Sequence, residues 1–362
     1  MEQKTEQRKT IKSILSIPGT RANVQSGQLL VSSGIPSVDE LLGGGLPVGS
    51  VVLIEEDSGG SYSRVMLRYF LAEGVVHKHA VFVGSQDYNP GKMTKELPAV
   101  ISSDPEPELL DEHKTDKMTI AFRYQKLPKV KKQTTHHFGN YYDLSKTMSQ
   151  ECFDNVNITE WPDQSALGGC QLSSMSYKEL LVAIKDKLEK DKYFINSIRE
   201  ERSILRLVLH SLGSGMWLKN EKYSEEESRN ALNTFMYNLR SLLRCSFAVA
   251  IVTVPSHLYS ESFTSRLYNL CDVAIKLEPF AGTALENNVA LSDFHGYFHL
   301  KKMSPINTLV SKHPGSVEYV FKLRRKKFCI EMLHLPPDLG DDDGSRNPKM
   351  GCSTGGGGDL DF

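Results

Sequence analysis

The 362-residue sequence contains no run of eighteen apolar residues, and this absence argues against a membrane-spanning helix. The first residues are polar and charged and lack the apolar segment of a secretory signal, so we expect a soluble intracellular protein. The formal net charge of −1 excludes a global attraction to nucleic acid or to a membrane surface. Any such attraction has to come from local patches of charge.

Cysteine is scarce, and none of the six cysteines belongs to a C-x-x-C pair. No histidine stands near a cysteine at the spacing of a zinc site, so we expect no metal centre and interpret the cysteines as reduced, mostly structural thiols. The pair His136 and His137 looks like half of a metal site. It has no partner at a useful spacing, which favours solvated side chains.

The stretch from Gly34 to Leu67 has the layout of a phosphate-binding loop, which reads G-x-x-x-x-G-K-[ST] between a buried strand and a helix. Residues 51–54 form an apolar run of strand type, and apolar positions recur with a helical period from residue 64 to residue 71. The loop between them consists of Glu56, Asp57, Ser58, Gly59, Gly60, Ser61, Tyr62 and Ser63. The structural context of the motif is therefore present.

The residues in the binding positions of this loop are wrong for a polyphosphate. Glu56 and Ser61 replace the two glycines, and Tyr62 replaces the lysine that reaches the β- and γ-phosphates. With Glu55 and Asp57, three carboxylates stand at the mouth, where repulsion of a triphosphate would cost on the order of several kcal/mol. We predict a loop that does not bind triphosphate in the usual way. An ordinary glycine-rich turn is the alternative.

A second part of the nucleotide machinery is also replaced. The strand predicted over residues 203–209 ends in His210, whereas the equivalent strand of a P-loop ATPase ends in an aspartate that orders Mg²⁺. Neutral imidazole is a poor ligand for this ion, which prefers oxygen. Taken singly, His210 is an ordinary strand-end histidine. Taken with Tyr62, it predicts the loss of hydrolysis, and we expect no catalytic residue in this chain.

The alternation of buried strands and amphipathic helices predicts an α/β fold of the RecA-like, P-loop NTPase type. We expect a mainly parallel sheet flanked by helices, with an antiparallel edge near the C-terminus. Further strands are predicted at 28–31, 80–83, 247–254, 273–277, 296–302 and 319–324. Helices are predicted after the N-cap residues Ser37, Ser176 and Ser224, and from Pro255 to about Leu270.

Composition divides the chain into three regions. Residues 1–20 are polar and predict a flexible arm, and residues 21–336 predict the RecA-like domain. Within that domain the pattern is lost over about 89–169, where prolines and charge runs predict a partly disordered insertion. Residues 337–362 contain three consecutive aspartates and four consecutive glycines and predict a disordered tail.

Five segments in this order resemble the Elongator complex protein 4 family: GIPSVDELLGGGLPVGSVVLIEED, VFVGS, IAFRYQKLP, RLVLHSLGS and VAIVTVP. The resemblance covers roughly residues 19–335, and its first part extends to RecA-like ATPases in general. It implies a heterohexameric ring with the fifth and sixth Elongator subunits, two copies of each, beside the catalytic Elongator core. It also implies a role in wobble-uridine modification of cytoplasmic tRNA, in which the ring binds tRNA and another subunit performs the chemistry.

The same resemblance allows ATP to act on the ring. Because this chain lacks the binding residues, we expect no cofactor bound directly by it, and ATP at an interface between subunits is the alternative. The implied location is cytoplasmic, with a nuclear, transcription-linked role as the weaker inference.

Contact with tRNA would depend on local basic patches. One candidate patch lies at the predicted antiparallel edge and comprises Lys301, Lys302, Lys322, Arg324, Arg325, Lys326 and Lys327. Phosphate contacts of this kind supply affinity without reading the sequence. A second candidate combines lysines within residues 129–132 with Phe122 and Tyr124, because aromatic rings stack on unpaired bases. Solvated surface charge, which also protects an edge strand from pairing, is the alternative.

Three other functions fit parts of the sequence. An active RecA-like ATPase or kinase with an unusual loop would turn over ATP by itself. A recombinase paralogue would prefer single-stranded DNA to tRNA. A pure scaffold would leave all RNA contacts to its neighbours.

Overall fold

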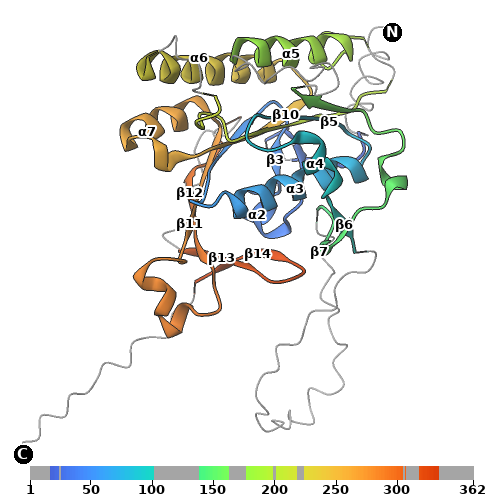
Figure 1. Ribbon diagram of the computed structural model, residues 1–362. Coiled ribbons are helices and arrows are strands. Elements are labelled where there is room, and N and C mark those ends of the chain that lie inside the picture. The colour runs from blue at the N-terminus through green and yellow to red at the C-terminus, as the bar shows by residue number, and fades with distance from the viewer. Residues whose placement is uncertain are drawn as a thin grey trace, which may run out of the picture.

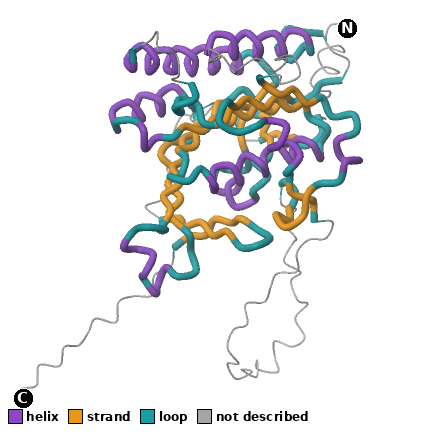
Figure 2. The backbone as a smooth tube through the Cα atoms, in the orientation of Figure 1, coloured by secondary structure: helices purple, strands orange, loops and turns teal. Residues whose placement is uncertain are grey.

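The structure is a computed structural model that describes residues 17–23, 26–101, 138–162, 177–198, 201–217, 224–304, 306 and 318–333. The centre of the fold is a nine-stranded sheet with the order β14-β13-β12-β11-β4-β10-β9-β5-β8. Helices lie on both faces of this sheet (Figures 1 and 2). The predicted α/β class with helices flanking a large sheet is confirmed.

Six neighbouring strands form the parallel part of the sheet. They are β4 (Val51–Glu55), β5 (Ala80–Ser85), β8 (Ile158–Trp161), β9 (Leu205–His210), β10 (Ala248–Val254) and β11 (Val273–Pro279). β10 pairs in parallel with both β4 and β9, so it separates the strand before the glycine-rich loop from the strand that ends in His210. This order is that of a RecA-like sheet.

Three antiparallel strands extend the sheet beyond β11: β12 (Gly296–Lys302), β13 (Tyr319–Leu323) and β14 (Phe328–Met332). The antiparallel edge was predicted, whereas β14 was not, because this five-residue segment becomes a strand by pairing with β13. Two N–H groups of this edge strand are satisfied by side chains. Phe328 N donates to Tyr69 Oη and Ile330 N donates to Ser37 Oγ, each at 3.1 Å. The edge is thus partly closed to pairing with another strand.

Two apolar layers hold the sheet between helices. One face packs on α2 (Pro36–Leu41), α3 (Ser61–Val76) and α4 (Pro90–Lys95), and the other on α5 (Tyr177–Lys190), α6 (Glu225–Arg244) and α7 (Glu261–Leu270). Along β4, Val52 and Ile54 join the α3 layer, whereas Val51 and Leu53 join the α6 layer. Burial on both faces accounts for the continuous apolar sequence of this strand.

Short elements complete the fold. β1 (Thr20–Ala22), β2 (Leu29–Val31) and β3 (Leu46–Pro47) form a small antiparallel sheet, and β6 (Pro98–Val100) pairs with β7 (Tyr142–Thr147). Single 3₁₀ turns lie at Gln150–Phe153, Ser256–Leu258, Ala284–Asn287 and Val289–Leu291.

The boundaries of two predicted regions differ in the structure. The insertion predicted over 89–169 contains α4, β6, β7 and β8, and β8 pairs with β5 in the main sheet. Prolines and charged residues between these short elements hid them from the sequence pattern. The C-terminal boundary predicted for the arm, residue 20, lies inside the folded domain, because Ile17 is buried in the core and β1 begins at Thr20. The tail from residue 337 lies outside the described residues.

Helix starts agree with the prediction in one case and differ in two. Ser224 caps α6 in a capping box with Glu227, as predicted. Ser37 is not an N-cap, because Ile35 takes that position and Pro36, whose fixed φ suits the first turn, begins α2. The helix predicted from Pro255 is divided into a 3₁₀ turn and α7. Ser176 lies outside the described residues, although α5 follows it.

Within the described part of the chain four cysteines are free thiols: Cys152, Cys245, Cys271 and Cys329. Cys170 and Cys352 lie outside it, as do His136 and His137. Among the same residues, no helix has both the length and the apolar character needed to cross a bilayer. No group of three or more His, Cys, Asp or Glu side chains there could hold a metal ion.

Candidate functional site

The candidate site lies where the parallel strands end. In open α/β sheets, ligands bind outside the carboxyl ends of the strands, and here β4 ends at Glu55 while β9 ends at His210. Residues 56–60 connect β4 to α3. Ser211, directly after β9, donates a hydrogen bond from its hydroxyl to Glu56 Oε2 at 3.2 Å. The fold therefore brings the predicted loop and the predicted His210 position to one edge of the sheet.

Asp57 places its carboxylate on the N-terminus of α3. Its Oδ2 accepts from Ser61 N at 2.9 Å, and its Oδ1 accepts from Tyr62 N and Ser63 N, each at 3.1 Å. The side chain is 3% exposed. One buried carboxylate thus satisfies the first three N–H groups of the helix, which in a nucleotide-binding loop face a phosphate.

Glu56 and Glu55, the other two carboxylates of the mouth, are held by hydroxyl groups of neighbouring elements. Glu56 Oε1 accepts from Thr253 Oγ1 on β10 at 2.5 Å, and Glu55 accepts from the Tyr268 hydroxyl on α7. Burial raises the pKa of both glutamates, and the hydrogen bonds from Thr253 and Ser211 oppose that rise for Glu56. These two side chains thus connect the end of β4 and the loop to β10 and α7.

Tyr62 stands at the lysine position of the motif but packs sideways onto the sheet. Its ring lies 4.7 Å from the ring of Phe321 on β13 and 6.2 Å from the ring of His295, measured between centroids. Burial raises the pKa of its hydroxyl, and the negative charge of Asp57 raises it further. Tyr62 is therefore a neutral packing residue at neutral pH and offers no positive charge to a phosphate.

Ser63 and His210 occupy the positions expected to serve a metal-bound nucleotide. The Ser63 hydroxyl is fully buried and has no hydrogen-bond partner among the described residues. His210 Nδ1 lies 3.0 Å from Ser85 Oγ at the end of β5. Burial lowers the pKa of His210 to about 4, so its imidazole is neutral near pH 7. A neutral, buried imidazole bound to a serine is a strand-end residue and a poor partner for Mg²⁺.

These contacts decide whether a magnesium-bound triphosphate, which the RecA-like fold implies, fits this loop. The three N–H groups that would hold a phosphate already bind Asp57. The only arginine of the first helical turn, Arg64, donates its Nε to Gly60 O at 2.8 Å. With three buried carboxylates and no lysine, the residues present do not fit a triphosphate.

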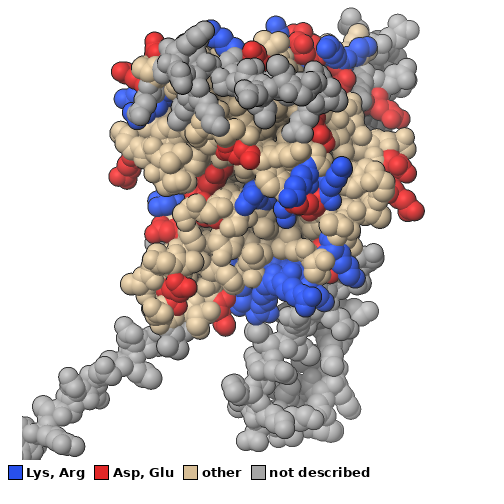
Figure 3. Space-filling view, in the orientation of Figure 1, with Lys and Arg blue, Asp and Glu red and all other residues tan. Residues whose placement is uncertain are grey.

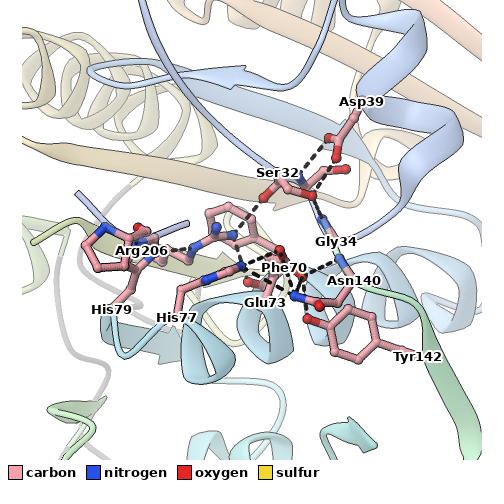
Figure 4. A network of polar contacts seen from close by, with 12 residues as sticks. Ser32, Gly34, Asp39, Phe70, Glu73, His77, His79, Asn140, Tyr142 and Arg206 are labelled. Carbon is pink, nitrogen blue, oxygen red and sulfur yellow. Dashed lines mark hydrogen bonds and ion pairs between the residues drawn. The ribbon is translucent and has the colours of Figure 1, made fainter. Parts of the chain in front are cut away.

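A buried polar network on the α3 side of the sheet was not predicted (Figure 4). Its centre is Arg206 of β9, which is fully buried and donates from Nη1 to Ser32 O at 2.8 Å and to Phe70 O at 3.1 Å. Its Nε donates to His79 Nδ1 at 3.1 Å. Burial, aided by the charge of Arg206, lowers the pKa of His79 to about 3. The signal in the sequence was a single arginine within the apolar strand LRLVLH.

Glu73 of α3 is the anion of this network (Figure 4). It is fully buried and accepts hydrogen bonds from the Tyr142 hydroxyl and from Asn140 N at 3.2 Å, while His77 Nε2 lies 3.0 Å from its Oε1. Burial alone would raise the pKa of Glu73, but the hydrogen bonds and the charge of Arg206 outweigh burial and lower it to about 2. Glu73 thereby ties the start of β7 to α3.

Asp39 of α2 is a second buried carboxyl group in this region (Figure 4). Ser32 Oγ donates to its Oδ2 at 2.5 Å, and Ser33 N donates to its Oδ1 at 2.8 Å. Burial raises its pKa to about 7 despite these hydrogen bonds. The network connects β2, α2, α3, β7 and β9, so its contribution is to hold the layers that carry the loop.

The predicted basic residues separate into two groups. Arg324, Arg325, Lys326 and Lys327 form the exposed turn between β13 and β14. This basic turn lies against β7, because Leu144 N donates to Lys326 O at 2.9 Å and Lys327 Nζ lies 5.4 Å from the centre of the Tyr141 ring. Figure 3 shows Lys and Arg side chains gathered at the lower end of the face that holds this hairpin.

The other three predicted residues do not belong to this surface. Lys302 Nζ donates to Tyr268 O at 2.8 Å and to Cys271 O at 2.7 Å, so it serves the C-terminal end of α7. Lys322 is buried, with Nζ 5.2 Å from the Phe294 ring centre. Lys301 is exposed but stands at the far end of β12 from the turn, roughly 16 Å along an extended strand from Gly296. The second candidate patch, with Phe122 and Tyr124, lies outside the described residues.

The strand order and the loop after β4 define a class: an α/β protein of the RecA-like type in which Asp57 binds the helix N-terminus that faces a phosphate in a nucleotide-binding loop. The PAXNEB protein family profile matches residues 13–362. Elongator complex protein 4 of Danio rerio is 40% identical over an alignment of 349 residues, which covers 92% of this chain and 88% of that protein. The Homo sapiens protein of the same name is 39% identical, covering 93% of this chain and 84% of its own length. The chain belongs to this family, the PAXNEB or Elongator complex protein 4 family.

A more distant relative has the same name. Elongator complex protein 4 of Saccharomyces cerevisiae is 22% identical over 372 residues, covering 88% of this chain and 76% of that protein. Among solved structures, the KaiC-like protein PH0186 of Pyrococcus horikoshii OT3 aligns with a TM-score of 0.45 and 18% identity, over 83% of this chain and 98% of its own. The family profile and the relatives at about 40% identity confirm the resemblance to the Elongator complex protein 4 family.

Proposed function

We propose that this chain is a noncatalytic subunit of an Elongator complex. The observation that carries the proposal is the identity of about two residues in five with proteins named Elongator complex protein 4, over more than nine-tenths of the chain. In this role the chain assembles with the fifth and sixth subunits, two copies of each, into an accessory ring. The ring supports wobble-uridine modification of cytoplasmic tRNA, and another subunit performs the chemistry.

The noncatalytic part of the proposal is supported by the loop. The carboxylate of Asp57 takes the N–H groups at the start of α3, Tyr62 packs on Phe321, and His210 is neutral. An active ATPase is the competing function, and it predicts Mg²⁺-dependent ATP turnover by the purified chain. We expect no turnover above that of a Tyr62→Ala, His210→Ala double variant. Turnover by the wild type that disappears in the double variant would support the ATPase.

The tRNA part of the proposal is supported by the basic turn formed by Arg324, Arg325, Lys326 and Lys327. Four consecutive exposed cations with no acidic residue among them give a local positive field on a protein whose net charge is only −1. Tyr141 lies beside the turn under Lys327. Such a surface binds phosphates of any sequence, so the affinity should fall steeply with salt.

The tRNA surface is tested by charge reversal in the assembled complex. The double substitution Arg324→Glu and Arg325→Glu is expected to weaken tRNA binding at least about tenfold. The slope of log K against log salt should become shallower by about two, because two phosphate contacts are lost. The matched control is Lys178→Glu with Lys185→Glu, which reverses two exposed charges on α5 and should leave binding unchanged. Equal binding by both double variants would favour a pure scaffold. Stronger competition by single-stranded DNA than by tRNA would favour a recombinase paralogue.

Assembly is tested by affinity purification of the chain from its own cells. We expect the other Elongator subunits, including the fifth and sixth, among the co-purifying proteins. Their absence would contradict the proposal, whatever the outcome of the tRNA measurements.

A further inference from the structure

We propose that Asp57 is a built-in substitute for a phosphate group, which keeps the loop between β4 and α3 closed without any nucleotide. Asp57 determines how this one loop is ordered. Its hydrogen-bond partners Ser61, Tyr62 and Ser63 are separate from the basic turn proposed to bind tRNA.

The position of Asp57 in the chain distinguishes it from an ordinary helix cap. In an ordinary cap the N-cap residue itself accepts from the second or third helical N–H group, as Ser224 does at α6. At α3 the N-cap residue is Gly60, which has a left-handed conformation with φ of 59° and no side chain to offer. The carboxylate comes from three residues earlier, after the loop has turned back over the helix end.

The loop wraps around the carboxylate as a phosphate-binding loop wraps around its ligand. Gly60 N donates to Asp57 O at 2.8 Å, which closes the turn. Ser61, Tyr62 and Ser63 then donate their N–H groups to the two carboxylate oxygens, and Ser61 Oγ lies 3.4 Å from Oδ2. Three convergent N–H groups at the start of a sixteen-residue helix are the usual setting of a bound anion.

Burial explains why the carboxylate and these N–H groups depend on each other. A carboxylate with 3% exposure has lost its hydration, and only strong hydrogen bonds offset that cost. The N–H groups have no partner within the helix and would also be left unsatisfied without an anion. The carboxylate of Asp57 and the N–H groups of the first helical turn therefore satisfy each other's hydrogen-bonding capacity. Because the carboxylate belongs to the chain, the anion position at the helix N-terminus is always occupied.

The consequence is a loop whose closed shape does not depend on a ligand. In a nucleotide-binding subunit the phosphate orders the loop, so the loop reports whether nucleotide is present. In this chain Asp57 supplies the anion covalently. The surface formed by the loop, with Tyr62 packed on Phe321, is therefore the same with or without ATP in solution.

The test removes the built-in anion and offers inorganic phosphate in its place. Asp57→Gly leaves the N–H groups of α3 without a partner and opens the space that the carboxylate filled. Thermal unfolding of the full chain is measured in chloride and in 50 mM phosphate at equal ionic strength. We expect the variant to melt several degrees below wild type in chloride, and phosphate to raise its melting temperature by about 3 °C more than it raises that of wild type.

Controls separate binding from the general stabilising effect of phosphate on folded proteins. Ser224→Ala removes an ordinary cap and should gain no more from phosphate than wild type gains. Asp57→Asn keeps the shape of the side chain, so it should fold even if Asp57→Gly does not, and it should still melt below wild type because the charge is lost. Equal stability of Asp57→Asn and wild type would overturn the proposal. An Asp57→Gly variant that folds and gains no more from phosphate than wild type would overturn it as well.

Discussion

Glu73 gives the sharpest prediction about stability, because its charge is buried and its partners are known. The perturbation is Glu73→Gln, which keeps the size of the side chain and removes the charge that faces Arg206. In the folded protein the pKa of Glu73 is lowered from 4.5 to about 2. At about 1.4 kcal/mol per pK unit, this shift corresponds to about 3 kcal/mol of stability above pH 4.5.

The sign of the pH dependence follows from the lowered pKa. Below pH 4.5 the unfolded chain takes up a proton at Glu73 while the folded chain does not, so this contribution is lost as the pH falls from 4.5 towards 2. At pH 3.5, which is about 1.5 pH units above the folded pKa, the charge of Glu73 still contributes about 2 kcal/mol to the free energy of unfolding. Glu73→Gln should therefore lower the free energy of unfolding by about 3 kcal/mol at pH 7 and by less at pH 3.5.

Urea denaturation followed by far-UV circular dichroism at the two pH values measures this difference. The matched control is Glu189→Gln on α5, which removes a half-exposed carboxylate paired with the exposed Lys185 and should cost no more than about 0.5 kcal/mol. A Glu73→Gln variant as stable as wild type at pH 7 would show that the buried charge of Glu73 does not stabilise the fold. A loss that is the same at both pH values would show that the hydrogen bonds matter and the charge does not.

Two further substitutions probe the same layer of the fold. Asp39→Asn removes a carboxyl group whose pKa is raised to about 7, so the ionised form weakens the wild type progressively as the pH rises from about 4 to 7. At pH 8 the free energy of unfolding of the variant should exceed that of wild type by up to about 4 kcal/mol, and urea denaturation at pH 5 should show a smaller difference. A difference between variant and wild type that does not change with pH would contradict the raised pKa of Asp39. Gly74→Ala would place a Cβ 2.7 Å from Arg206 Cδ and 3.3 Å from Val81 Cγ2, so it should destabilise by about 1–3 kcal/mol despite the better helix propensity of alanine. The control Gly215→Ala, whose Cβ would meet no atom within 4 Å, should be neutral, and urea denaturation of both glycine variants measures the difference.

The parallel core of the fold could be predicted because its signals are local. β4 and β10 are almost entirely apolar, β9 is apolar except for Arg206 and His210, and the helix after the loop shows its period directly in the sequence. β14 could not be predicted in this way, since it becomes a strand by pairing with β13 and by hydrogen bonds to Tyr69 and Ser37. The insertion was overestimated for a related reason: β8 is only four residues long and depends on β5.

What the loop lacks follows from residue identity alone. The absence of a lysine at Tyr62 and of an aspartate at His210 is a matter of residue identity and position, and it needs no coordinates. The same holds for family membership, which depends on the order of the segments along the chain. Residue identity also located four consecutive cations at 324–327.

The roles of the remaining charges depend on the three-dimensional fold. Asp57 turned from a repulsive group at the mouth into the anion that holds the helix N-terminus, because the loop folds back over three N–H groups. Lys302 turned from a candidate RNA contact into a partner of two carbonyl groups of α7, and Arg206 became the centre of a buried network. The role of a charge depends on the partners that the fold brings within hydrogen-bond distance, and those of Arg206 lie more than a hundred residues away in the sequence.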